Sequence, residues 1–364
     1  MSNTPIQRIL FGCPGTGKSY KIKNEILKDL GIDQNSDNYI STVFHPEYTY
    51  GDFMGKLVPI TNEAGKVEYN FYGGHFLRAL IKAYKNLINA YNQQNNEFNT
   101  PQNVALIIDE INRGNSSAIF GTAFQLLDRE TKDDFRGWSS YPINLTDIEM
   151  NFFKKEIGLE PKDQQENGAT YKIFTLGDIA TKLKLNEFEN KIIELFGFNI
   201  LNNSVKIPPN LSILATMNTS DNSIYFMDNA FKRRWDWEYV DWDDDFAKRI
   251  PPAKYGTNGD LKWDNGWKKL VKNLNTFIKQ NANSIRGGKI EDMQIGYYFI
   301  KDDFVSAEKI RNKLMFFVWD SIFNRDKTPL QKLLKVDKKD LVTFGDFIKK
   351  HNEFVNNLLL EKFE

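Results

Sequence analysis

This chain of 364 residues has little cysteine and histidine, and neither charge is in excess. Its single cysteine, Cys13, can form no disulfide within the chain, which favours a reducing cytoplasm. The three histidines and one cysteine show no zinc-ligand spacing. The 48 basic and 48 acidic residues cancel, so bulk charge does not draw the chain to nucleic acid. No signal peptide and no apolar run of about 18 residues is present, so we expect a soluble cytoplasmic protein without membrane contact.

A glycine-rich loop near the start of the chain matches the pattern G-x-x-x-x-G-K-[ST] of phosphate-binding loops. Its sequence is Gly12-Cys13-Pro14-Gly15-Thr16-Gly17-Lys18-Ser19. The apolar run before it predicts a buried strand, and the apolar spacing after it predicts a helix over Tyr20–Leu30. Glycines allow backbone N–H groups to turn toward a phosphate, and the start of the helix adds the positive end of its dipole.

The loop pattern assigns contacts with the nucleotide to most of these residues. Lys18 supplies a positive charge for the outer phosphates, and Ser19 supplies a hydroxyl for Mg²⁺. Cys13 is expected to fill a small space rather than to act as a reactive thiol. We expect the nucleotide to be held by the following residues of the loop and of the helix start: Gly12, Pro14, Gly15, Thr16, Gly17, Lys18, Ser19 and Tyr20.

A second apolar run, Val104–Ile108, ends in the two adjacent acids Asp109 and Glu110. Such a run predicts a central parallel strand with the acids at its carboxyl edge, where ligands bind in open α/β sheets. We expect Asp109 to hold Mg²⁺ through water and Glu110 to polarise the attacking water. A metal anchor and a base together favour hydrolysis, and the alternative is a strand that ends in solvated acids.

Two further polar elements are candidates for the same chemistry. Asn218 follows the apolar run Leu211–Thr216, where its amide could orient the attacking water, although such residues also favour turns. Arg233 and Arg234 follow a predicted short helix, Met227–Lys232. One of them could reach the γ-phosphate of a neighbouring subunit as an arginine finger. The alternative is a solvated helix end that the helix dipole favours.

The order of predicted elements indicates an α/β domain followed by a helical one. Strands and helices alternate up to about residue 135, as in βαβ units. Residues from about 131 to 207 are polar and broken by Gly and Pro, which predicts an insertion containing one helix, Leu183–Phe196. We therefore predict a nucleotide-binding domain at 1–245 and a mostly helical domain at 246–364. Other predicted elements are strands at Ser41–Phe44 and Trp235–Val240 and helices at Phe76–Tyr91, Asn115–Arg129, Trp267–Gln280 and Ala307–Phe323.

The phosphate loop and the acidic strand, in this order, resemble an AAA+ ATPase. Four further segments resemble the McrB family, the GTPase motor subunits of modification-dependent restriction systems: Phe44–Phe53, Met217–Ile224, Asp228–Trp235 and Gln294–Phe299. The resemblance implies an AAA+ α/β sandwich with a parallel central sheet, a middle insertion and a C-terminal helical lid. It also implies GTP, with ATP as the alternative, Mg²⁺, and a hexameric ring in which Arg233 or Arg234 acts on the next subunit.

Departures from the family pattern shape the expected partners. Asn222 stands where the family usually has arginine, and the loop begins at Gly12, so we expect no DNA-recognition domain before it. No endonuclease motif is apparent, so cleavage is expected from a McrC-like endonuclease subunit and DNA contact through the complex. Two other functions stay open. One is a MoxR- or dynein-related ATPase that remodels proteins, and the other is a DNA-binding scaffold that nucleotide controls.

Overall fold

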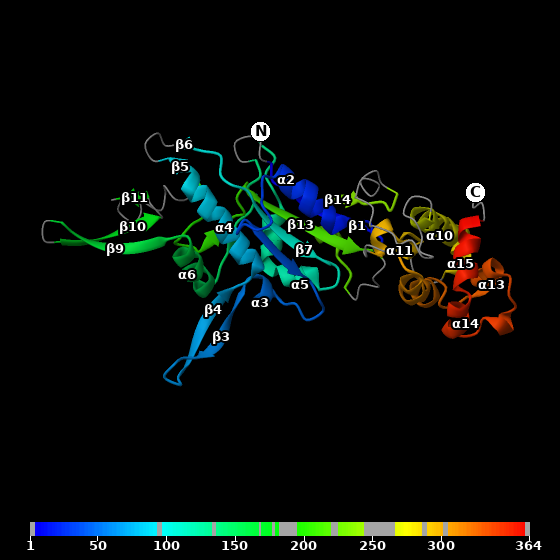
Figure 1. Ribbon diagram of the computed structural model, residues 1–364. Helices are drawn as coiled ribbons and strands as arrows, with labels where there is room; N and C mark the ends of the chain where they lie inside the picture. Colours follow the sequence, from blue (N-terminus) through cyan, green and yellow to red (C-terminus); the bar gives the residue numbers. More distant parts are fainter. Residues whose placement is uncertain are drawn as a thin grey trace. The chain divides into compact units, whose positions relative to one another are not determined.

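The structure is a computed structural model, shown in Figure 1. It describes residues 4–92, 97–132, 136–166, 169–176, 179–181, 195–219, 225–243, 266–285, 290–300 and 305–360. The predicted helix at Leu183–Phe196 lies almost wholly outside these residues, as does Asn222. Within the described ranges, no helix is both long and apolar enough to cross a membrane.

The chain forms two compact units. Unit 1 comprises residues 1–9, 22–217 and 223–237, and unit 2 comprises residues 10–21, 218–222 and 238–364. The phosphate loop therefore groups with the C-terminal helices in unit 2. The domain boundary proposed near residue 245 stays a prediction.

A five-stranded sheet with the order β14-β1-β13-β7-β2 forms the centre of the α/β fold. Both β13 and β2 pair with β7 in parallel. The first five residues of β7 are buried, as expected for a parallel strand covered on both faces. The expected α/β fold with a parallel central sheet is thus confirmed. The strands are β1 (Gln7–Gly12), β2 (Tyr39–Val43), β7 (Val104–Asp109), β13 (Leu211–Asn218) and β14 (Asp236–Tyr239).

Within the described residues, helical structure occurs where the apolar spacing predicted it, but several of these segments are not α-helical throughout. The helix after the phosphate loop runs through α1 (Lys18–Lys21), a π-helical turn and α2 (Leu27–Asp29). Helix α4 (His75–Ala90) packs against β2 and β7. The predicted helix at Asn115–Arg129 is instead α5 (Ser116–Phe120) followed by a 3₁₀ helix, Gly121–Leu127. Gly121 explains the break, because its φ of +50° is left-handed and a Cβ there would lie 2.8 Å from the Tyr50 ring.

The insertion at about 131–207 contains more regular structure than the sequence predicted. Helix α6 (Asp147–Glu156) begins with a capping box in which the side chains of Thr146 and Glu149 bond each other's backbone N–H groups. Figure 1 shows β9 and β10 as a long hairpin beside α6, and a second hairpin, β3–β4, begins after α3 (Tyr50–Phe53). The hairpin and smaller strands are β3 (Gly55–Thr61), β4 (Val67–Gly73), β5 (Tyr91–Asn92), β6 (Glu97–Phe98), β8 (Ile143–Asn144), β9 (Leu159–Glu166), β10 (Ala169–Leu176), β11 (Ile179–Thr181) and β12 (Ser204–Val205).

Arg129 fastens the start of the insertion to the segment that returns to the sheet. Its guanidinium donates to the carbonyls of Gly137 at 2.8 Å and Leu211 at 2.7 Å, and to the Gln7 side chain at 3.2 Å. Charge-assisted bonds to backbone carbonyls are stronger than neutral ones. The insertion therefore leaves and re-enters the sheet at fixed points.

Unit 2 has its own apolar core around the C-terminal helices. Helix α10 (Lys268–Gln280) buries Leu270, Leu274 and Phe277 on one face. Cys13 of the phosphate loop joins the same core. The other helices are α11 (Ile290–Met293), α12 (Ala307–Lys309) with π-helical turns at Ile310–Met315 and Val318–Ile322, α13 (Thr328–Leu334), α14 (Phe344–Lys349) and α15 (His351–Leu360).

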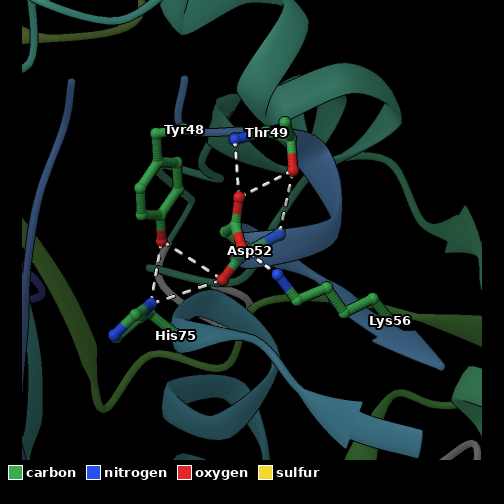
Figure 2. Close-up of polar contacts among 5 residues, drawn as sticks. All are labelled: Tyr48, Thr49, Asp52, Lys56 and His75. Carbon is green, nitrogen blue, oxygen red and sulfur yellow. Dashed lines mark hydrogen bonds and ion pairs between the residues drawn. The ribbon is translucent and has the colours of Figure 1, made fainter. Parts of the chain in front are cut away.

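Tyr48, Thr49 and Asp52, which lie between β2 and β3, form a polar cluster with Lys56 of β3 and His75 of α4 (Figure 2). Asp52 accepts from the Thr49 backbone N–H at 2.9 Å and from Lys56 at 2.6 Å. The Tyr48 hydroxyl and Nδ1 of His75 share a hydrogen bond of 2.8 Å. Burial raises the pKa of Asp52, but the bonds from Lys56 and Thr49 outweigh it and lower the value to about 2. Burial lowers the pKa of His75.

We expect this cluster to produce two separate losses of stability in acid. The unfolded chain protonates His75 first, so stability falls as the pH drops below the ordinary value of 6.5. The stability that Asp52 supplies above its ordinary pKa of 3.8 is lost as the pH approaches about 2. His75→Gln should reduce only the first loss, and Asp52→Asn only the second. Urea unfolding over a pH series measures both. His45→Gln, at an exposed position, is the matched control, and an equal effect from it would contradict the assignment.

Candidate functional site

The phosphate loop turns four consecutive carbonyl oxygens toward donors of its own unit. Nζ of Lys18 donates to the carbonyls of Gly12 at 3.0 Å and Cys13 at 2.9 Å. The carbonyl of Pro14 accepts from the backbone N–H of Gly296, and that of Gly15 from Tyr298, each at 2.8 Å. Gly15 and Gly17 take positive φ angles of 82° and 91°, which explains the glycines of the motif.

Cys13 is a buried part of this loop. Burial raises the pKa of its thiol to about 12, so the thiol stays protonated near neutral pH. Its side chain is 1% exposed and packs in the unit 2 core. This arrangement fits the expected role as filler and excludes a thiolate nucleophile here.

Asp109 is the last residue of β7 and Glu110 follows it, and a threonine of the neighbouring strand β13 bonds to both. The hydroxyl of Thr216 donates to Oδ1 of Asp109 at 2.9 Å. The Thr216 hydroxyl oxygen also accepts the backbone N–H of Glu110 at 3.3 Å. One residue further on, the N–H of Ile111 donates to the Thr216 carbonyl at 3.0 Å. Thr216, which is 4% exposed, therefore fixes both acids and the turn that follows them.

Glu110 has an uncommon backbone conformation. Its φ is +56°, in the left-handed region that residues with a side chain seldom adopt. Such conformations cost about 1–3 kcal/mol and concentrate at functional sites. Glu110 is half-buried, as is Asp109, whereas the first five residues of β7 are buried. The turn thus places the Glu110 side chain directly after the carboxyl end of β7, with Oε2 buried.

Asn218 is the last residue of β13, two residues beyond Thr216. The next backbone N–H, that of Thr219, donates to the Gly12 carbonyl at 3.3 Å. The structure therefore brings the end of β13 against the start of the phosphate loop within unit 2. Asp109, Glu110 and both candidate arginines belong to unit 1.

The two adjacent arginines differ in their surroundings. Arg234 donates to Oδ2 of Asp128 through Nε at 2.9 Å and Nη2 at 2.7 Å, and it lies 3.9 Å from the centroid of the Phe124 ring. Arg233 is the C-cap residue that directly follows α8 (Asn229–Lys232), and it is exposed. No bond of its guanidinium is found within the described residues. Arg234 is therefore fixed by contacts within unit 1, whereas the Arg233 side chain is exposed.

Three residues of these sites were missed by the sequence reasoning. Thr216 was taken only as the end of a strand, although the register that pairs Ala215 with Ile108 sets it opposite Asp109. Gly296 and Tyr298 were noted as a family segment without a role. No sequence signal joins residues 14–15 to residues 296–298, because the contact is made by backbone atoms.

Comparisons with known proteins add one relative over nearly the full length. The chain is 27% identical over 379 aligned positions to the type II restriction enzyme BsuMI component YdiS of Bacillus subtilis, covering 97% of this chain and 87% of that one. No family model matches. A solved structure of a candidate ATPase from Cytophaga hutchinsonii shares 12% identity with a TM-score of 0.24, covering 98% of this chain and 86% of its own. That TM-score is too low to support an argument.

We expect Thr216→Val to slow nucleotide hydrolysis by about 10- to 100-fold, in the range for loss of a residue that orients a site. Valine keeps the shape but removes the hydroxyl that bonds Asp109 and Glu110. Thr216→Ser is the matched control, since it keeps the hydroxyl and should turn over near the wild-type rate. Steady-state phosphate release measures both. Equal rates for the valine and serine variants would show that the hydroxyl does not position the acids.

Proposed function

We propose that the chain is an AAA+ nucleoside triphosphatase that serves as the motor subunit of a restriction system. The observation that carries the hydrolytic part is the acidic pair at the carboxyl end of β7, where the Thr216 hydroxyl bonds the Asp109 carboxylate and the backbone N–H of the left-handed Glu110. A loop that only binds nucleotide needs no such arrangement of a second carboxylate. In the strand order, β13 alone separates β7 from β1, which leads into the phosphate loop.

In this proposal each site residue acts on one triphosphate. The loop amides and Lys18 bind the phosphates, Glu110 takes the proton of the attacking water, and Asn218 orients that water. When Lys18 turns to the phosphates, the two loop carbonyls that it bonds still have other hydrogen-bond donors. The Gly12 carbonyl keeps the N–H of Thr219 at 3.3 Å, and the Cys13 carbonyl keeps the Thr16 hydroxyl at 3.3 Å.

The residues also fit the metal that such chemistry uses. The Ser19 hydroxyl and the Asp109 carboxylate are hard oxygen donors of the kind Mg²⁺ prefers, and Asp109 is already oriented by Thr216. In the proposal these two residues hold Mg²⁺. When bound, the ion offsets negative charge on the triphosphate.

The biological setting is proposed from the similarity to the BsuMI component over most of both chains. Hydrolysis drives movement along DNA and activates a partner endonuclease of the McrC kind. The sequence segments that resemble the McrB family favour GTP over ATP. They also favour a hexameric ring in which the exposed Arg233 reaches the nucleotide of the next subunit.

Glu110→Gln should bind nucleotide and assemble as the wild type does, yet hydrolyse it at least about 100-fold more slowly, as expected for loss of a general base. The amide keeps the size of the side chain but cannot accept the proton. Turnover of GTP and ATP is measured with and without DNA and the partner nuclease. Near-normal hydrolysis by the variant would contradict the role of Glu110. Turnover that ignores DNA but responds to a protein substrate would favour the remodelling ATPase.

Mixing experiments separate the two arginines. Neither Arg233→Ala nor Lys18→Ala should hydrolyse nucleotide alone, but mixed oligomers should recover part of the activity, because some interfaces then join an intact loop to an intact Arg233. Arg234→Ala should instead lower the unfolding temperature, since it leaves Asp128 without its ion pair. Mass photometry verifies that mixed oligomers form. Absence of recovery in verified mixtures would exclude action of Arg233 on a neighbour.

A further inference from the structure

The Pro14–Gly15 and Gly15–Thr16 peptide groups of the phosphate loop are oriented by donors more than 280 residues away in the sequence. The N–H of Gly296 donates to the Pro14 carbonyl and that of Tyr298 to the Gly15 carbonyl, each at 2.8 Å. Both donors lie on a short segment, Gly296–Phe299, closed on itself by the bond from the Phe299 N–H to the Gly296 carbonyl at 3.0 Å. We call this segment the brace.

Because peptide groups are planar, these bonds also determine the direction of the N–H groups in the same two peptides. In a planar trans peptide the C=O of one residue and the N–H of the next point in opposite directions. Holding the carbonyls of Pro14 and Gly15 toward the brace therefore turns the N–H groups of Gly15 and Thr16 away from it. These two N–H groups belong to the part of the motif that surrounds a phosphate.

The brace is itself fixed to the core of unit 2. Asn275, which is fully buried on α10, donates to the carbonyl of Ile295 at 2.8 Å and accepts the N–H of the same residue at 3.0 Å. The fully buried Trp267 donates through Nε1 to the Tyr297 carbonyl at 2.8 Å. The Tyr297 hydroxyl bonds Asp243 at 3.0 Å. A continuous chain of hydrogen bonds thus connects α10 to the loop.

The contact between brace and loop leaves no room for a side chain. A Cβ on Gly296 would overlap the carbonyl of Gly15 and crowd the nitrogen of Thr16 at 2.5 Å. A Cβ on Gly15 would overlap the backbone of Phe299. Adding one methyl group at Gly296 must therefore displace the loop, the brace or both.

We infer that the brace is a positioning element for phosphate binding. It turns the amides of Gly15 and Thr16 toward the triphosphate, and Gly296 and Asn275 are its positioning residues. The inference rests on the proposed function, because it assigns how the same loop is prepared for nucleotide. It makes the affinity for phosphate groups depend on residues of α10 that lie outside the motif.

The first test is Gly296→Ala, compared with Gly345→Ala, where a Cβ would meet nothing closer than 3.5 Å. Binding of fluorescent Mg-GTP and Mg-ATP should weaken at least about tenfold in the first variant, equal to about 1.4 kcal/mol, and stay unchanged in the second. If the wild type binds neither nucleotide, the proposed function fails. If the wild type binds and Gly296→Ala binds equally well, only the brace is refuted.

A second variant acts at a distance from the loop, in case Gly296→Ala folds poorly. Asn275→Leu removes both bonds to Ile295. It should weaken triphosphate binding several-fold more than binding of the free nucleoside, because only the phosphates contact the loop. The additional effect of Asn275→Leu should largely disappear in a Lys18→Ala background. Equal weakening of nucleoside and triphosphate, or full additivity with Lys18→Ala, would indicate a general packing role and overturn the inference.

Discussion

A loop that surrounds phosphate must turn its carbonyl oxygens away from the anion and still give each of them a donor. In this chain the donors come from four sources. They are the lysine and the Thr16 hydroxyl of the motif, the turn after β13, and the brace before α12. The glycines allow the required backbone angles, but they do not select them among the many that glycine can adopt. Part of the selection comes from outside the motif, from segments that belong to the same compact unit as the loop.

The carboxyl end of β7 is also held by hydrogen bonds from a neighbouring segment, and here a side chain, that of Thr216, makes two of them. A left-handed residue with a side chain is strained, and it persists only where the surrounding structure fixes it. The hydroxyl of Thr216 bonds the carboxylate of Asp109 and the N–H of Glu110, and the Thr216 carbonyl bonds Ile111. Strand β13 thus serves both sites, since its Thr216 orients the acids and the N–H after its end bonds the loop. Strand β13 can make both sets of bonds because it lies between β1 and β7 in the sheet.

Much of the fold and part of the site could be predicted from the sequence, because apolar periodicity and short motifs are local signals. The strands at β2, β7 and β13 and helix α4 were found from such signals. The interruption at Gly121 was not, since it depends on the Tyr50 ring, which is distant in sequence. Helix α6 was missed although its capping box, Thr146 to Glu149, is a sequence signature. The roles of Thr216 and Gly296 depend on strand register and on backbone contacts, which leave no pattern in residue types.

The two glycines that meet between loop and brace also restrict how this protein can change over evolutionary time. At most positions a bulky substitution can be rescued when its neighbour becomes smaller. Here each glycine faces the main chain of the other segment, namely the carbonyl of Gly15 on one side and the backbone of Phe299 on the other. Main-chain atoms are the same in every amino acid, so no replacement at the contacted position can make space. A substitution at either glycine therefore cannot be compensated by a second substitution at the residue it contacts. Compensation requires a shift of the whole backbone segment.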